Sequence, residues 1–100
     1  MNSPLTKGYT YLAITSNVDG HQGWIIQQTG QRSWVATQFT ECGTEATESS
    51  VIIGNSIKCW EELFSVTQSD KIVWRKVNSK SEMREKMYYI LKYGNFKEEK

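Results

Sequence analysis

The last quarter of the chain constrains the fold most, because it encodes a strand, a helix cap and an amphipathic helix in direct succession. Residues 71–77 read KIVWRKV, which is typical of a β-strand. Ser79 and Glu82 then have the spacing of a capping box, in which the hydroxyl accepts from the third helical amide and the carboxylate accepts from the cap amide. Gly94 suits the left-handed position that follows a helix. The apolar stripe between them, at helical spacing, comprises Met83, Met87, Ile90 and Leu91.

The first half of the chain predicts an antiparallel meander. Residues 9–16, YTYLAITS, alternate between two faces and are rich in β-favouring side chains. The segment NVDGHQG at 17–23 has the composition of a turn. Residues 24–39 form two β-favouring runs on either side of TGQR, and this arrangement predicts a β-hairpin.

The middle of the chain predicts a loop, a short strand and a first helix. Residues 40–50, TECGTEATESS, are small and polar and predict an exposed loop. A short apolar strand follows at 50–53. Asn55 or Ser56 can cap the helix, because a short side-chain oxygen accepts from a free amide of the first turn. The apolar side of this helix comprises Ile57, Trp60, Leu63 and Phe64.

The order of these elements, β-β-β-(β)-α-β-α, predicts an α+β fold. We expect an antiparallel sheet of about four to five strands with both helices packed on one face. Residues 1–100 fit one domain, with the polar loop at about 40–50 and a short charged tail at 95–100. The sequence shows neither a secretory signal nor an apolar run long enough for a membrane span. We therefore expect a cytoplasmic protein with Cys42 and Cys59 reduced; one disulfide between them is the alternative.

The residue set argues against several enzymatic chemistries. His21 is the only histidine, and it lies in the predicted turn with Asp19 as its nearby carboxylate. One histidine and two widely spaced cysteines do not supply the four ligands of a structural zinc site, and no glycine-rich phosphate motif occurs. Glu61 and Glu62 fall on the polar side of a helix, as expected of a solvated face. We expect no catalytic residue, metal or cofactor; a small hydrolase or transferase built on His21 and residues 40–50 is the enzymatic alternative.

Charge is unevenly distributed along the chain, although the formal net charge is only +1. Residues 71–97 contain eight Lys and Arg residues and two Glu residues, which gives +6. Residues 41–70 contain six Asp and Glu residues and one Lys residue, which gives −5. The positive segment is therefore the part of the sequence that most favours binding of another molecule.

Cations interleaved with aromatic residues in that segment suit two kinds of binding. Tyrosine and arginine are enriched at the centres of protein interfaces, and the same residues can stack bases and contact phosphates. A simpler structural interpretation is that the tyrosines bury their rings at the boundary between helix and sheet. The candidate partner-binding residues are Arg75, Lys76, Arg84, Lys86, Tyr89, Tyr93 and Trp34.

The sequence favours a small non-enzymatic binding protein that regulates or inhibits a protein partner by occluding or organising it. Chains of this size are common among regulators and inhibitors, including those of phages and mobile elements. The alternative is a nucleic-acid-binding module that uses the same basic and aromatic residues, although the isoelectric point of about 7.7 is low for a duplex binder. The identity of the partner and the formation of a homo-oligomer stay open.

Overall fold

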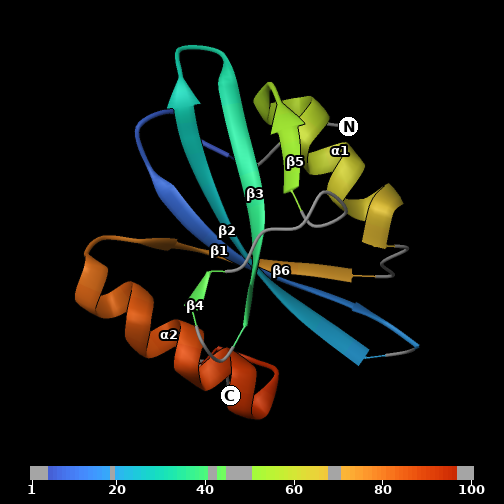
Figure 1. The fold of residues 1–100 in the computed structure, drawn as a ribbon, viewed down its shortest axis with the longest axis vertical. Helices are drawn as coiled ribbons and strands as arrows, with labels where there is room; N and C mark the ends of the chain where they lie inside the picture. The colour runs from blue at the N-terminus through green and yellow to red at the C-terminus, as the bar shows by residue number, and fades with distance from the viewer. Residues whose placement is uncertain (1–4, 19, 41–42, 45–50, 68–70, 97–100) are drawn as a thin grey trace.

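The computed structural model describes residues 5–18, 20–40, 43–44, 51–67 and 71–96 (Figure 1). The strands are β1 (Thr10–Asn17), β2 (Gly20–Gly30), β3 (Ser33–Thr40), β4 (Gly43–Thr44), β5 (Val51–Gly54) and β6 (Lys71–Val77). The helices are α1 (Ser56–Thr67) and α2 (Lys80–Tyr93).

The strands form one antiparallel sheet in the order β4-β3-β2-β1-β6, and β5 pairs with the same edge of β3 as β4 does. The α+β class, the antiparallel sheet and the order of the elements are therefore confirmed. The two-residue β4 is an additional strand within the segment predicted as a polar loop at 40–50. Residues 41–42 and 45–50 of that loop lie outside the described residues.

The turn between β1 and β2 is shorter than predicted. Asn17 pairs directly with Gly20, so only two residues separate the paired strands. Gly20 has a φ of 134°, a conformation that favours glycine. Two-residue connections are the commonest in hairpins, and this one lets β2 begin at Gly20. The predicted turn at 17–23 is therefore too long, because residues 20–23 belong to β2 and His21 lies on that strand.

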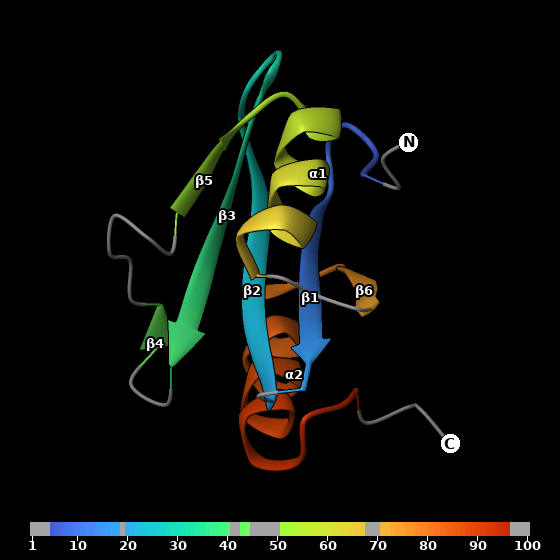
Figure 2. The same ribbon diagram turned by 90° about the vertical axis from the view of Figure 1, so that its right-hand side faces the viewer.

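The two helices cover opposite faces of the sheet (Figure 2). Successive side chains of a strand point to opposite faces. On β1, Tyr11 and Ala13 belong to the core under α1, whereas Leu12 and Ile14 belong to the core under α2. The prediction that both helices pack on one face is therefore wrong. Because all four of these side chains are buried, β1 is apolar on both faces and each face needs its own helix.

The core on the α1 side is aromatic. Trp24, Trp34 and Trp60 are buried there and Trp74 is half-buried against them, so all four tryptophans of the chain lie on this side of the sheet. Tyr11 contacts two of them, with ring centroids 6.3 Å from Trp34 and 5.5 Å from Trp74. The other buried members of this core are Leu5, Ala13, Ile26, Ala36, Ile52, Cys59 and Leu63.

The core on the α2 side is mostly aliphatic and contains fewer buried residues among those described. The predicted stripe faces it, but of the described side chains of α2 only Ile90 is buried, while Met83, Met87 and Leu91 are half-buried. Phe96, beyond the helix, is fully buried in the same cluster, so the tail predicted at 95–100 begins too early. The sheet contributes Leu12, Ile14, Ile25, Phe39, Val73 and Val77.

The ends of α2 lie where the sequence predicts them. The Ser79 hydroxyl accepts from the Glu82 amide at 3.1 Å. Gly94 has a φ of 75°, and its amide donates to the Ile90 carbonyl at 2.7 Å. The Glu82 carboxylate accepts from the Asn78 amide at 3.1 Å, one residue before the predicted cap amide. Both ends of the helix are therefore fixed by local hydrogen bonds.

A cap and a buried thiol position α1. The Asn55 side-chain oxygen accepts from the Lys58 amide at 2.8 Å, so Asn55 is the cap. Cys59 is free and fully buried in the core. Burial raises the pKa of its thiol from 9.0 to about 11, and the negative charge of Glu62 adds to the rise. Cys59 thus packs as a neutral core side chain; Cys42 lies outside the described residues.

Candidate partner-binding surface

The seven predicted binding residues do not form one surface. Trp34 is only 4% exposed, because β3 directs it into the core under α1, and its prediction as a binding residue is wrong. Arg75 and Lys76 are consecutive on β6, so their side chains point to opposite faces of the sheet. Arg75 pairs with Leu12 and faces the α2 side. Lys76 pairs with Tyr11 and faces the α1 side.

Lys76 forms a local contact on the α1 side of the molecule. Its Nζ lies 4.2 Å from the centre of the Tyr9 ring, and both residues are exposed. A cation over an aromatic face is attracted by the ring quadrupole, by about 0.5–1 kcal/mol at an exposed site. This pair is separated from α2 by the sheet, so Lys76 is not part of a surface built on that helix.

Arg75 and Lys86 converge on one buried ring. The Arg75 Cζ lies 5.2 Å and the Lys86 Nζ 5.8 Å from the centre of the Phe96 ring, and Phe96 is fully buried. The Arg75 guanidinium also donates to the Trp74 carbonyl at 2.7 Å. Both cations are half-buried, so their stems cover the end of the α2-side core. Arg75 and Lys86 therefore cover the buried Phe96 ring and stabilise this end of the core.

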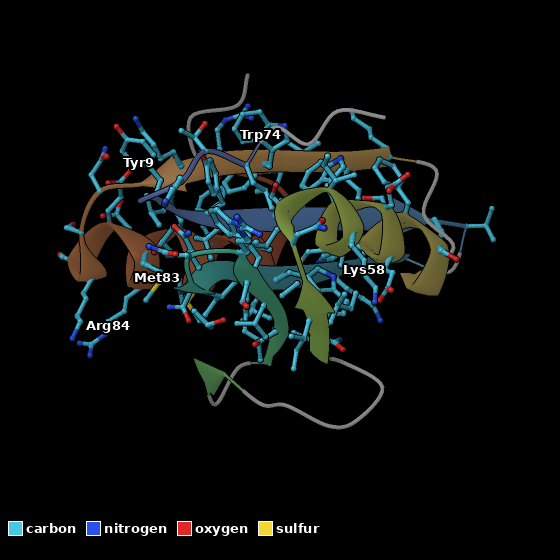
Figure 3. The ribbon with its side chains drawn as sticks, turned by 90° about the horizontal axis from the view of Figure 1, so that it is seen from above. Tyr9, Lys58, Trp74, Met83 and Arg84 are labelled. Atoms are coloured by element: carbon cyan, nitrogen blue, oxygen red, sulfur yellow. The ribbon has the colours of Figure 1, made fainter. Side chains whose placement is uncertain are left out.

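The outer side of α2 presents an aromatic and cationic area that we call the tyrosine surface: Arg84, Tyr88, Tyr89, Lys92 and Tyr93. Tyr88 is 66% exposed and Tyr93 is 54% exposed. The Lys92 Nζ lies 5.9 Å from the centre of the Tyr88 ring and 5.3 Å from that of Tyr93. The Tyr89 and Tyr93 ring centroids are 4.5 Å apart. Arg84, one turn before Tyr88, points away from the body of the molecule (Figure 3).

Of the seven predicted residues, Tyr89 and Tyr93 lie together on the tyrosine surface. Arg84 lies at its other margin, about half a helical turn around the axis from Tyr93. The candidate set omitted Tyr88 and Lys92. Their signal is the spacing from Arg84, since residues four apart on a helix lie on the same side. Arg75 and Lys76 lie close to α2 in the sequence, but their side chains are on opposite faces of the sheet.

Among the described residues, side chains with catalytic potential do not converge. His21 is exposed on β2, and its ring lies so close to Gly94 that a Cβ there would be 3.0 Å from the ring. Glu61 is exposed, and Glu62 forms a solvent-exposed ion pair with Lys58 at 3.7 Å. No group of three His, Cys, Asp or Glu side chains in this part of the chain could hold a metal ion.

A hollow of about 500 Å³ opens between the β2–β3 connection and the start of α1. Its lining includes Lys7, Gln28, Arg32 and Asn55, and none of its described lining residues is a carboxylate, a histidine or a thiol. General acid–base and nucleophilic catalysis commonly use such groups. The hollow therefore gives no support to a hydrolase or transferase, and most of the proposed enzymatic segment, residues 40–50, lies outside the described residues.

No protein family, curated protein or solved structure matches the chain. Within the described ranges, neither helix combines the length and apolar character needed to cross a membrane. Since these comparisons give no relative, a function can be proposed only from features of the structure, and the tyrosine surface is the feature used below.

Proposed function

We propose that this protein is a non-enzymatic regulator or inhibitor that binds a protein partner on the tyrosine surface and acts by occluding or organising it. The supporting observation is the exposed pair Tyr88 and Tyr93 on either side of Lys92. Tyrosine combines a large apolar ring with a polar end, and clusters of tyrosine with cations are typical of the energetic centres of protein interfaces.

The rigidity of α2 supports this proposal. Ser79 caps the first turn and Gly94 ends the last one, while the Ile90 stripe anchors the opposite side of the helix. A partner would therefore meet side chains on a preformed helix, with little backbone to order on binding. Tyrosine also loses little conformational entropy on binding, because its side chain has few rotatable bonds.

The distribution of cations favours a protein partner over nucleic acid. A single-strand binder follows the phosphate backbone with a continuous positive groove. Here Lys76 lies on the α1 side, and Arg75 and Lys86 lie over a buried ring. The tyrosine surface itself retains only two cations, so it offers few phosphate contacts.

The test compares the wild-type chain with the double variant Tyr88→Ala/Tyr93→Ala. Each chain is used as bait in the organism that encodes it, and captured proteins are quantified by mass spectrometry. The captured protein is then purified and titrated by calorimetry. We expect the double variant to bind about tenfold to a hundredfold more weakly, because two central aromatic contacts are lost.

Tyr9→Ala is the matched control, since Tyr9 is an exposed tyrosine on the opposite side of the sheet. It should leave the affinity within about twofold of wild type. Equal capture by wild type and the double variant would contradict the proposal. So would binding of mixed-sequence oligonucleotides with a log–log salt slope of about −3 to −4, which indicates about four phosphate contacts.

A further inference from the structure

The outer edge of β6 is the longest strand edge that the described residues leave without a partner. β6 pairs with β1 on one side, and no described strand pairs with its other side. Figure 2 shows β6 beyond β1 at one end of the sheet. At the other end, the edge of β3 is shared by β4 and β5, which are two and four residues long. β6 has seven residues and contains neither proline nor glycine.

The register indicates which residues of β6 direct their backbone groups outward. Asn17 and Gly20 flank a two-residue connection, and such a pair exchanges both of its backbone hydrogen bonds. Bonded and non-bonded pairs then alternate along β1, so its even-numbered residues direct their groups toward β6. We infer that the N–H and C=O groups of Ile72, Trp74 and Lys76 point away from β1.

The side chains of the edge are incompletely covered. Ile72 and Trp74 are half-buried on the α1 side, and Val73 is half-buried on the α2 side. Trp74 packs edge-on against Tyr11 at 5.5 Å and lies at the outer margin of the molecule (Figure 3). A further strand beside β6 would cover apolar surface on both faces and would pair with the outward backbone groups. At Trp74 it would replace the Arg75 guanidinium, which donates to the Trp74 carbonyl at 2.7 Å.

The charges of β6 select the kind of strand that can bind. Lys71 and Lys76 are exposed, Arg75 is half-buried, and the strand has no acidic residue. A second copy of β6 would place three cations beside three others, and lysine on an edge strand is known to oppose such self-pairing. A segment with glutamate or aspartate would instead be attracted.

We propose that the outer edge of β6 binds an extended acidic segment of the protein partner by strand addition. The inference rests on the proposed function only in requiring that the partner is a protein. It concerns a different element, because the tyrosine surface lies on α2 and the edge lies on β6. Either proposal can therefore fail while the other stands.

The test uses a fluorescein-labelled synthetic peptide of about ten residues that alternates glutamate and valine, titrated into the full-length chain at low salt. We expect saturable binding by fluorescence anisotropy. Hydrogen exchange should slow at the amides of Ile72, Trp74 and Lys76. The amides of Val73 and Arg75 should not change, because they already face β1.

Two control peptides separate strand addition from attraction between charges. One has the same sequence but is N-methylated at alternate residues, which removes hydrogen-bond donors and keeps the charge. The other has lysine in place of glutamate. The N-methylated peptide should bind at least about tenfold more weakly because it cannot form the backbone hydrogen bonds. The lysine peptide should bind at least about tenfold more weakly because the cations of β6 repel it.

A charge-reversed chain gives the reciprocal test. Lys71→Glu/Lys76→Glu should lose affinity for the glutamate peptide by about tenfold and gain affinity for the lysine peptide. Lys80→Glu is the matched control, since Lys80 is exposed at the start of α2, outside the strand edge. It should leave both affinities within about twofold of wild type.

Three results would each overturn strand addition: no binding of the glutamate peptide at low salt, equal binding of its N-methylated form, or unchanged exchange at the outward amides. The Tyr88→Ala/Tyr93→Ala chain should still bind the peptide as wild type does. If it does, and if capture of the natural partner is also unchanged, the tyrosine surface proposal fails while strand addition stands.

Discussion

The two sides of the sheet are covered in different ways. On the α1 side, the described side chains that the helix buries are Cys59, Trp60 and Leu63, which pack among large aromatic residues. On the α2 side, a longer helix buries only Ile90 among its described side chains, and most of its large aromatic residues are outside. Helix length is therefore not a measure of how firmly a helix is held. The α1 side provides most of the packing, and the α2 side leaves its aromatic residues available for binding.

The chemistry of the two cores explains the contrast. Aromatic side chains bury large areas and pack with defined geometry, as in the edge-on pair of Trp60 and Phe64 at 5.9 Å and 79°. The α2 side relies on Met83 and Met87, whose flexible side chains fill a surface without fixing a single arrangement. A change of equal size should therefore have a larger effect on the α1 side.

The largest expected difference is between Leu63→Ala and Met87→Ala. Leu63 is fully buried, so its truncation should lower the free energy of unfolding by about 2–5 kcal/mol. Met87 is half-buried, and its truncation should cost about 1–2 kcal/mol, because its lost contacts and the resulting cavity are smaller. Urea denaturation followed by circular dichroism measures both. Equal losses would show that the two sides do not differ in packing.

The second prediction concerns the α1-side core and the way its buried Cys59 thiol makes stability depend on pH. The folded state raises this pKa from 9.0 to about 11 by burial and by the charge of Glu62. The folded protein therefore keeps the thiol proton longer than the unfolded protein as pH rises. The stabilisation is complete below pH 9 and should fall by about 2–3 kcal/mol as pH rises through 11.

The measurement compares Cys59 with Cys59→Ala chains, both in a Cys42→Ser background so that only one thiol titrates. Unfolding free energies are determined by urea denaturation at steps from about pH 8 to about pH 11, the interval that the pKa shift defines. The difference between the two chains isolates the contribution of the thiol from that of every other ionisable group. A difference that stays constant with pH would contradict the burial of a neutral thiol.

The last prediction tests a close contact on the α2 side. A Cβ added to Gly23 would fall within 3.0 Å of three atoms of the Phe39 ring, and Phe39 is buried. Gly23→Ala should therefore cost about 1–3 kcal/mol through overpacking. In the Phe39→Leu background the same change should cost less, because the ring is gone. A double-mutant cycle by thermal denaturation measures this coupling, and additive effects would contradict the contact.

The helix at Lys80–Tyr93 could be predicted from the sequence because its signals are local. Ser79, the apolar stripe and Gly94 all lie within one segment, and each acts through its own neighbours. The face that each helix covers depends instead on strand pairing and on the path of the chain. A signal was nevertheless present: the run Tyr11–Ile14 is apolar at every position, which is typical of a strand covered on both sides.

The candidate surface was harder to predict, because sequence neighbours can be spatially separated. Arg75 and Lys76 are adjacent in the sequence, and strand alternation alone predicts that they face opposite ways. The burial of Phe96 under two cations could not be predicted, since it depends on how the chain returns to the sheet after Gly94. Trp34 illustrates the same limit: its strand was predicted, but not the face on which it lies.

All four tryptophans lie on one side of the sheet, so tryptophan fluorescence monitors the α1 side and not α2. Tryptophan emission reads the surroundings of Trp24, Trp34, Trp60 and Trp74, all of them on the α1 side. Fraying of α2 would reduce helical ellipticity but leave the indole surroundings intact. Agreement between the two signals would therefore measure how strongly the two sides melt together. Tryptophan emission therefore reports on the α1 side and on the β6 edge at Trp74, whereas the tyrosine surface on α2 contains no tryptophan.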